Sequence, residues 1–370
     1  MTGWNSYAAD PARRWQAVAR RARTLDRTLL FDESAQAIFD LNPTADAIWQ
    51  GIEATLPAGG IADRVARLGA SPDEAQAHVA RALAGWAGMG LILPLPRSDP
   101  ADAARAVDLI GNAIRITFSA DLSAAVEVAV GHLAGVHDDA ATTVALERAG
   151  ERVDLYVDGT WAMACPGVEA PVALKGLLLS LVLARTDHAL VLHAATLVTD
   201  DGATLLLGPP GRGKTTLTLT LLARGWRYGG DDVALLLDDG RCRPVPLAPA
   251  AKAGAWTLLR RDWPVIDDRP VWLRPDGQQV RYLPPGPLAD GAHDVARIVF
   301  LDRTDTGAAT LHRLDAVAAF EAVLADAHLA SERLTPDAFS TVAAILDRAP
   351  AWRLAYADAA DAAEVLGRAR

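Results

Sequence analysis

The segment LLLGPPGRGKTT at residues 205–216 constrains the fold of this chain more than any other. From Gly208 to Thr215 it follows the pattern G-x-x-x-x-G-K-T. The apolar run before it predicts a strand, and the Thr/Leu-rich run that continues to Gly225 predicts a helix. A strand, a glycine-rich turn and a helix in this order direct backbone N–H groups and the positive end of the helix at one point. The segment therefore predicts a phosphate-binding loop within a domain that mixes strands and helices.

The chemistry of this loop indicates which residues would contact a nucleotide. Glycines let consecutive backbone N–H groups converge on phosphate oxygens, Lys214 adds a positive charge, and the Thr215 hydroxyl would bind Mg²⁺. The sequence therefore predicts a nucleotide and Mg²⁺ site formed by Gly208, Gly211, Arg212, Gly213, Lys214, Thr215 and Thr216.

Two adjacent aspartates follow the loop. Asp231 and Asp232 stand 17 and 18 residues after Lys214, and the apolar run VALLL comes after them. In ordinary P-loop ATPases the Mg²⁺-associated aspartate instead ends an apolar strand and lies much further along the chain. Before the loop, apolar runs near 189–198 and 203–207 predict two strands, which flank Thr-Asp-Asp-Gly, a strong hairpin signal.

This arrangement resembles the HPr kinase/phosphorylase family and the nucleotide site of phosphoenolpyruvate carboxykinases. The likeness is carried by RGWRYGGDDVALL, by His193 in LHAA, by P-x-x-K at Pro249 to Lys252, and by VRYLPP at 280–285. It spans about residues 105–345 and is closest to the HPr-kinase-related proteins found with peptide-modification genes. The signature expected of the sugar-transport carrier kinases after the D-D pair is not evident, so the likeness does not extend to their carrier substrate or their reverse reaction.

The resemblance implies an ATP-dependent kinase and a role for each matching residue. Asp231 is expected to take the proton of the acceptor hydroxyl and Asp232 to join Thr215 on Mg²⁺, with the reverse assignment also open. His193 would orient a carboxylate or the phosphate, unless it is a core histidine. Lys252 and Arg281 would stabilise charge on the transferred group. The alternatives are a surface residue for Lys252 and a structural ion pair for Arg281.

Residues 27–95 have the pattern of a small separate domain. The expected elements are strands at 28–31 and 35–41 and helices that begin at Asn42–Pro43, near residue 61 and at Ser71. Ser71 and Glu74 form a capping box at the start of the third helix, which ends at Gly90. Two short strands and three helices predict a winged-helix-like module.

This module resembles the PqqD-like elements that recognise leader peptides in ribosomal-peptide modification systems. The likeness rests on a frame formed by Leu41, Asn42, Thr44, Ile48 and Trp49. It implies that a precursor peptide adds as a strand along 36–41 and lies against the third helix. The expected peptide contacts are Ala37, Ile38, Phe39, Leu41, Val79 and Leu83. The alternative is that the helical residues are simply core. A winged helix can also bind DNA, but the acidic start of the third helix opposes contact with phosphate.

These readings give the expected organisation of the chain. The fold class is α/β (α+β), with an HPr-kinase-like P-loop domain and a small N-terminal winged-helix-like domain. The expected boundaries are an amphipathic lead-in at 1–26, the module at 27–95, a linker at 96–104, an α+β layer at 105–187, and the P-loop core with C-terminal helices at 188–370. Lys175, in the apolar helix of the α+β layer, is expected to face solvent or a partner.

Composition narrows the classes of partner. A net charge of -10 opposes nucleic-acid binding, which requires a basic face. Cys165 and Cys242 are far apart and have no metal-ligand spacing, which predicts buried thiols in a reducing compartment. The apolar run at 176–184 is cut off by Arg185 and Asp187, so we expect no membrane helix, and the N-terminus lacks the apolar segment of a signal peptide. A cytoplasmic protein is expected, and a homo-oligomer is open.

Three functions are compatible with the sequence. The first is an ATP-dependent kinase for a Ser or Thr hydroxyl of a ribosomally made precursor peptide, delivered by the N-terminal module. The second is a kinase for a small molecule or free amino acid. The third is a nucleotide-sensing regulator without enzymatic activity. ATP turnover with and without candidate peptides separates the first from the other two.

Overall fold

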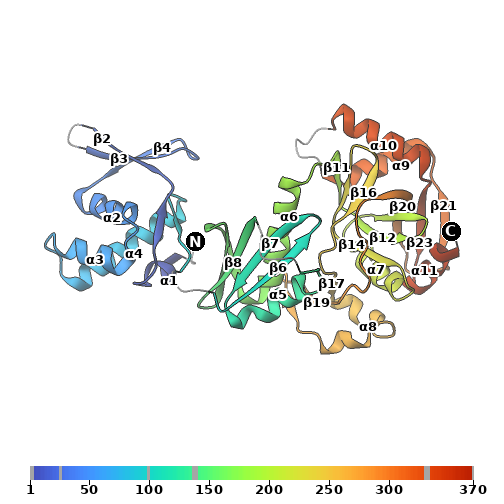
Figure 1. Ribbon diagram of the computed structural model, residues 1–370, viewed down its shortest axis with the longest axis horizontal. Coiled ribbons are helices and arrows are strands. Elements are labelled where there is room, and N and C mark those ends of the chain that lie inside the picture. The colour runs from blue at the N-terminus through green and yellow to red at the C-terminus, as the bar shows by residue number, and fades with distance from the viewer. Residues whose placement is uncertain (1–3, 25–26, 98–100, 136–140, 329–333, 369–370) are drawn as a thin grey trace. The chain divides into compact units, whose positions relative to one another are not determined.

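The computed structural model describes residues 4–24, 27–97, 101–135, 141–328 and 334–368. Within them the protein is a mixed α/β structure with several sheets (Figure 1). The chain forms two units. Unit 1 contains residues 1–104, 115–120 and 142–167, and unit 2 contains 105–114, 121–141 and 168–370.

Unit 1 begins with a helical and stranded module. Its elements are α1 (Trp4–Ala8), β1 (Trp15–Ala17), β2 (Arg20–Thr24), β3 (Arg27–Asp32), β4 (Ala37–Leu41), α2 (Pro43–Glu53), α3 (Ala58–Ala66), α4 (Pro72–Gly88) and β5 (Ile92–Pro94). Both predicted caps are confirmed. The Asn42 side chain accepts a hydrogen bond from the N–H of Ala45, and Ser71 and Glu74 form the reciprocal capping box of α4.

The first residues of the chain belong to this module, so the predicted lead-in at 1–26 is wrong for the described residues among them. β2 pairs with β3, and β1 pairs with β5. Tyr7 and Trp15 lie in the same core as Trp49 and Leu83, and Trp15 is fully buried. Two aromatic side chains near the N-terminus explain this, because burial of each removes a large apolar area from water. Residues 1–3 and 25–26 lie outside the described part.

Unit 1 also contains β8 (Thr142–Ala149), β9 (Arg152–Val157) and β10 (Thr160–Pro166), which are consecutive antiparallel strands. They belong to a five-stranded sheet with the order β10-β9-β8-β7-β6, where β6 is Ala103–Leu109 and β7 is Asn112–Phe118. The predicted single layer at 105–187 is therefore divided between the units. β6 begins at Ala103, inside the predicted linker, of which 98–100 lie outside the described residues.

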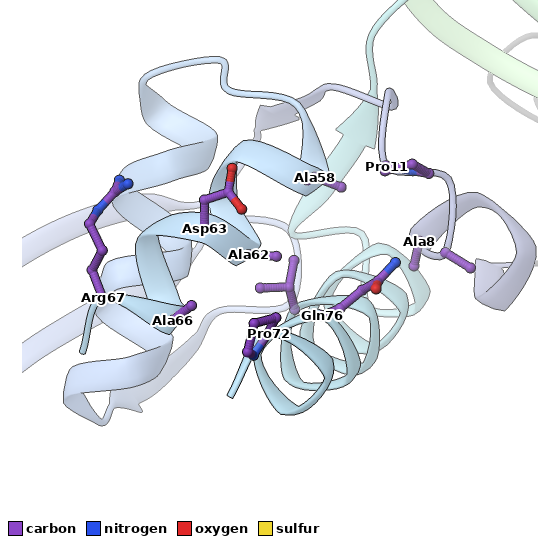
Figure 2. Close-up of a pocket in the computed structure, with 12 residues that line it drawn as sticks. Ala8, Pro11, Ala58, Ala62, Asp63, Ala66, Arg67, Pro72 and Gln76 are labelled. Atoms are coloured by element: carbon purple, nitrogen blue, oxygen red, sulfur yellow. The ribbon is translucent and has the colours of Figure 1, made fainter. Parts of the chain in front are cut away.

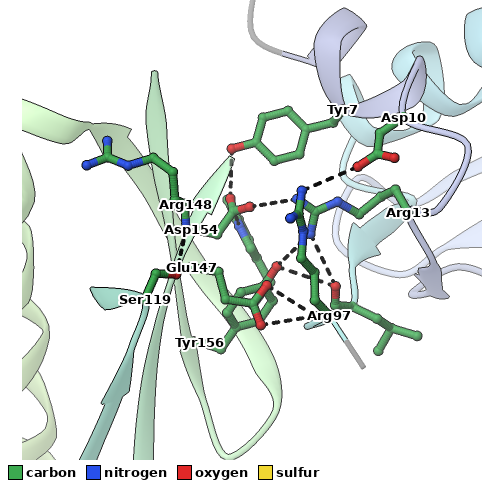
Figure 3. A network of polar contacts seen from close by, with 11 residues as sticks. Tyr7, Asp10, Arg13, Arg97, Ser119, Glu147, Arg148, Asp154 and Tyr156 are labelled. Carbon is green, nitrogen blue, oxygen red and sulfur yellow. Dashed lines mark hydrogen bonds and ion pairs between the residues drawn. The ribbon is translucent and has the colours of Figure 1, made fainter. Parts of the chain in front are cut away.

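A buried polar network links the start of the chain to β9 within unit 1 (Figure 3). The Tyr7 hydroxyl donates to Asp154 at 2.8 Å, and the Arg13 guanidinium contacts the other oxygen of this carboxylate at 3.2 Å. A second guanidinium nitrogen of Arg13 donates to the Tyr156 hydroxyl at 3.2 Å. Burial raises the pKa of Asp154, and the bond from Tyr7 and the charge of Arg13 oppose that rise in part. The buried carboxylate of Asp154 thus has both a hydrogen-bond donor and a counter-charge, as a buried charge requires.

Unit 2 is built on a large mixed sheet. Eight strands follow the order β14-β12-β13-β20-β16-β15-β11-β22, and β23 pairs with β20 and β21. The strands are β11 (Leu190–Leu192), β12 (Ala195–Thr199), β13 (Gly202–Leu207), β14 (Arg227–Gly230), β15 (Ala234–Leu236), β16 (Arg241–Pro244), β20 (His293–Arg303), β21 (Thr310–Arg313), β22 (Ala327–His328) and β23 (Ala351–Tyr356). β13, β20 and β23 are mutually parallel, and the β12–β13 hairpin turns at the predicted Asp-Gly.

Helices cover both faces of this sheet, as Figure 1 shows. Leu205 and Leu207 of β13 face a core shared with α9 (Ala316–Ala325) and α10 (Pro336–Arg348). Leu206 faces the opposite core, shared with α7 (Lys214–Leu222) and α11 (Ala359–Arg368). Burial on both faces explains why β13, the strand before the glycine-rich loop, ends in the apolar run Leu205–Leu207.

Unit 2 also contains further helices and a small sheet. They are α5 (Ser123–Val130), α6 (Ala170–Arg185), α8 (Trp256–Leu259) and a small sheet of β17 (Ala250–Lys252), β19 (Gln279–Tyr282) and β18 (Trp272–Leu273). The helical stretch Gly167–Arg185, with 19 residues and a mean hydropathy of 1.7, is long and apolar enough to cross a membrane by length and composition. The expectation that no stretch reaches this limit is therefore wrong. Length and composition alone do not show that a helix crosses a membrane. α6 also carries the buried Lys175, which is described below.

Candidate functional site

The phosphate loop leaves the end of β13 and enters α7, as the sequence predicts. α7 begins at Lys214, directly after Gly213. Gly213 has φ 90°, and a Cβ atom there would lie 2.6 Å from the Tyr356 hydroxyl, so only glycine fits. That hydroxyl donates to the carbonyl of Arg212 at 2.7 Å, so β23 fixes the end of the loop. The first N–H groups of α7 therefore point into a turn of defined shape.

Lys214 and Thr215 occupy the two positions that the loop pattern predicts. The ammonium of Lys214 folds back over the loop and donates to the carbonyl of Gly208. Burial, which outweighs several nearby carboxylates, lowers the pKa of Lys214. The Thr215 hydroxyl donates to Asp231 Oδ2 at 3.2 Å. The structure thus joins the loop to the first aspartate of the D-D pair through one hydrogen bond.

The two adjacent aspartates have unlike surroundings. Asp231 is 3% exposed, and burial, together with the negative charge of Asp232, raises the pKa of its carboxyl. The Tyr228 hydroxyl lies 3.2 Å from Asp231 Oδ1 and 2.7 Å from the carbonyl of Leu247. Gly230 has φ 143°, and a Cβ there would lie 2.6 Å from the carbonyl of Val245, so the turn into the pair requires glycine.

Asp232 is open to the adjoining cavity, with 52% of its side chain exposed. Neighbouring groups exclude part of the water around the Asp232 carboxyl, which acts to raise its pKa. The charge of Lys175 and its hydrogen bond outweigh this effect. The pKa of Asp232 is therefore held below its ordinary value. One carboxylate is thus buried beside the loop, and the other is accessible and ionised.

Lys175, on α6, is one of the residues that the sequence analysis did not assign to the site. Its ammonium donates to Asp232 Oδ2 at 3.2 Å and to the carbonyl of Ala248 at 2.6 Å, and its side chain is 9% exposed. The expectation that it faces solvent or a partner is wrong, because these two acceptors replace the water that burial removes. The chain has only three lysines, and that scarcity was the one available signal.

A cavity of about 330 Å³ lies over the loop and the D-D pair. Its walls bring together most of the predicted residues with two arginines that were not predicted. They include His193, Gly211, Gly213, Lys214, Thr215, Thr216, Asp231, Asp232, Lys252, Arg274 and Arg303. Lys252 ends β17 and lines this cavity.

Two predicted residues differ in position from the expectation. His193 lies at a bend between β11 and β12 and not within one long strand at 189–198, and its N–H donates to the carbonyl of Asp326 at 2.8 Å. It still lines the cavity. Arg281 does not line it: its guanidinium donates to the carbonyl of Ile266 at 2.8 Å, pairs with Asp267 and lies 4.2 Å from the ring centre of Trp256. The alternative of a structural ion pair describes Arg281 as found.

The residues present fit a nucleotide phosphate chain with Mg²⁺. A helix N-terminus, a buried lysine and a hydroxyl bonded to a buried carboxylate converge at the floor of one cavity. Within the described ranges, no three His, Cys, Asp or Glu residues gather as a self-sufficient metal site. The pair formed by Thr215 and Asp231 fits Mg²⁺, since Mg²⁺ is usually held by one or two carboxylates together with substrate phosphates and water.

In unit 1 the residues predicted to bind peptide fall into two groups. β4 is an edge strand of the sheet β2-β3-β4, and its Ile38 is 68% exposed beside Phe31 of β3, at 39%. Ala37 and Phe39 are partly exposed, and Leu41 is 9% exposed. Val79 and Leu83 are 2% and 0% exposed, so they are core residues, as the alternative interpretation held.

A second cavity in unit 1, of about 470 Å³, is formed by α3, the start of α4 and the segment after α1 (Figure 2). Small side chains such as Ala58, Ala62 and Ala66 line it, with Asp63 of α3 and Arg67, which follows that helix. Nothing in this wall resembles the glycine-rich loop of unit 2, and its composition points to no particular ligand.

Comparisons with known proteins found a family match and a weak structural likeness. Residues 27–92 match the family model of coenzyme PQQ synthesis protein D (PqqD). A solved structure of the Hpr(Ser) kinase/phosphatase from Coxiella burnetii has 14% sequence identity, covers 48% of this chain and 94% of its own, and gives a TM-score of 0.25. A TM-score this low supports no conclusion about this chain. No curated protein matches the sequence.

Proposed function

We propose that this chain is an ATP-dependent kinase that phosphorylates a Ser or Thr hydroxyl of a ribosomally made precursor peptide. The observation that carries the proposal is the hydrogen bond between Thr215 of the phosphate loop and Asp231, with ionised Asp232 next to it and open to the same cavity. A regulator needs only the nucleotide site, whereas an accessible carboxylate beside it supplies what transfer to a hydroxyl requires.

The contacts favour an exchange of the two aspartate roles assigned from the sequence. Asp231 lies beside the Thr215 hydroxyl, so the two would hold Mg²⁺ together. Mg²⁺, when bound, would neutralise charge on the β- and γ-phosphates and keep Asp231 ionised. Asp232 does not contact Thr215, faces the cavity and is held by Lys175, which suits a group that accepts a proton from the acceptor.

The transfer that these residues support forms one bond, breaks one bond and moves one proton. The acceptor oxygen forms a bond to the γ-phosphorus, the bond from that phosphorus to the β–γ bridging oxygen breaks, and ADP leaves. The hydroxyl proton passes to Asp232. Lys214 and the N–H groups at the start of α7 bind phosphate oxygens, and Lys252, Arg274 and Arg303 line the cavity where charge on the transferred group is stabilised.

The N-terminal module supports a peptide as the acceptor. Residues 27–92 match the PqqD model, and β4 presents an edge whose outward backbone groups can pair with an added strand. A module that holds the leader segment raises the local concentration of the acceptor segment, so the transfer site itself needs few contacts.

ADP formation, measured with and without a candidate precursor peptide, tests the proposal. We expect the peptide to stimulate ADP formation, and the same peptide with each Ser and Thr replaced by Ala to bind without stimulation. Equal rates with no peptide, with the native peptide and with the substituted peptide would contradict it.

A further inference from the structure

A second cavity in unit 2, of about 320 Å³, adjoins the phosphate cavity. The two cavities share part of their lining: His193, Asp231, Asp232, Ala250 and Arg274 belong to both. The D-D pair is therefore a common wall, with the phosphate loop lining only the first cavity and α6 lining only the second.

One face of α6 forms the far side of this second cavity. Val172, Lys175, Gly176 and Leu179 line it, and their spacing of three, one and three residues places them on a single helical face. Leu247 and Tyr282 close the opposite side. Apart from Lys175 and the Tyr282 hydroxyl, the side chains on these two sides are apolar.

Two cations line the cavity, Lys175 on α6 and Arg274 at the shared wall, and each has an acidic neighbour. Lys175 is bonded to Asp232 and to the carbonyl of Ala248, and the guanidinium of Arg274 lies 3.5 Å from Asp276. An acidic side chain that entered the cavity would leave water, meet the negative charge of Asp232 and compete with Asp232 and Asp276 for these two cations, so its burial is unfavourable. A neutral hydroxyl-bearing side chain avoids this penalty, since its hydroxyl can donate to the exposed oxygen of Asp232 and its carbon atoms can contact the apolar walls.

We infer that this cavity is the acceptor pocket, which takes a Ser or Thr side chain from a peptide segment with apolar, uncharged neighbours. The inference rests on the proposed function for the identity of the reaction, and on the shared wall for the position of the pocket. The acceptor approaches from the α6 side, and the nucleotide from the loop side.

Gly176 provides a specific way to close the pocket. It lies in the middle of α6, lines the cavity, and a Cβ atom added to it would have no heavy atom within 4 Å. Gly176→Leu therefore extends into open space, and it replaces the residue with a poor helix propensity by one with a good propensity. Ala184→Leu is a matched control, since Ala184 is exposed on the same helix and lines neither cavity.

The experiment uses the full chain and two probes, acetyl-Leu-Thr-Leu-amide and acetyl-Asp-Thr-Asp-amide. Binding of each probe is measured by saturation-transfer NMR in the presence of Mg²⁺ and a non-hydrolysable ATP analogue. We expect the apolar probe to bind the native chain and to lose at least about tenfold in affinity with Gly176→Leu, which corresponds to ~1.4 kcal/mol. Affinity for the ATP analogue should not change, and Ala184→Leu should match the native chain in both measurements.

Unchanged binding of the apolar probe to the Gly176→Leu chain would overturn the inference, and so would equal binding of the acidic probe to the native chain. Phosphate transfer from ATP to the apolar probe is measured in parallel. If the probe binds and Gly176→Leu removes that binding, but the native chain transfers no phosphate, the pocket stands and the proposed function fails.

Discussion

The ammonium of Lys175 lies 3.2 Å from Asp232 Oδ2, although the two residues are 57 positions apart in the sequence. This ion pair connects α6 to the turn that follows β14, and it holds the accessible carboxylate of the site in one orientation. The carbonyl of Ala248 accepts a second hydrogen bond from the same ammonium, so two acceptors fix the position of the Lys175 ammonium.

Removal of this lysine should impair transfer more than nucleotide binding. Lys175→Met keeps the length and apolar stem of the side chain but leaves Asp232 without its partner. We expect kcat for peptide phosphorylation to fall by about 10- to 100-fold, because a misplaced reacting group is less effective by that order. Affinity for Mg·ATP, measured by calorimetry, should stay within about twofold of the native value. A parallel loss of nucleotide affinity would show that Lys175 supports the whole cavity and not Asp232 alone.

The two aspartates should respond differently to the same substitution. Asp231→Asn removes the charge beside Thr215, so we expect Mg²⁺-dependent affinity for ATP and transfer to fall together. Asp232→Asn preserves shape but removes the proton acceptor, so transfer should fall by a factor on the order of 10² to 10⁴ while Mg·ATP still binds. Calorimetry beside a phosphorylation assay separates these outcomes. The opposite pattern would restore the assignment made from the sequence.

Lys214→Ala should abolish transfer and greatly weaken ATP binding, because the ammonium that neutralises the phosphates is lost. Arg281→Ala is the matched control. Arg281 is also positively charged, but it contacts Ile266 and Asp267 and does not line the cavity. We expect Arg281→Ala to retain ATP affinity. Near-native ATP binding by Lys214→Ala would refute the phosphate-loop interpretation.

The buried ion pair of unit 1 should matter for stability. The side chains of Arg13 and Asp154 are 2% and 0% exposed, so Asp154→Asn leaves a buried guanidinium without its counter-charge. We expect unit 1 to lose about 3–5 kcal/mol of stability to denaturant. Asp40→Asn is the control: it removes an exposed pair with Arg27, at 48% and 65% exposure, and should change stability by no more than about 1 kcal/mol. A loss for Asp154→Asn as small as that for Asp40→Asn would show that the network in Figure 3 contributes little to stability.

Short sequence patterns predicted the helix starts, the hairpin turn and the glycine-rich loop. The capping residues Asn42 and Ser71 set helix starts, the Asp-Gly turn sets the hairpin, and the glycine pattern sets the loop before Lys214. Each depends on contacts within a few residues. The β13 strand was also predictable, because burial on both faces leaves mostly apolar residues in it.

Contacts between distant segments were not predictable in the same way. Lys175 appears in an apolar helix, and nothing near it in the sequence identifies Asp232 as its partner. Tyr7 and Arg13 lie in a segment rich in charge, so the buried carboxylate of Asp154 that recruits them into unit 1 was not apparent. Arg274 lines the site from a short loop without a recognisable pattern.

The central claim is tested most directly by intact-mass measurement of a candidate precursor peptide after incubation with the full chain and Mg·ATP, with ADP measured in the same sample. The account predicts a peptide that gains the mass of one phosphate for each ADP formed, on a Ser or Thr located by fragmentation, and no gain with Asp232→Asn. ADP released together with free phosphate, while the peptide keeps its original mass, would contradict it.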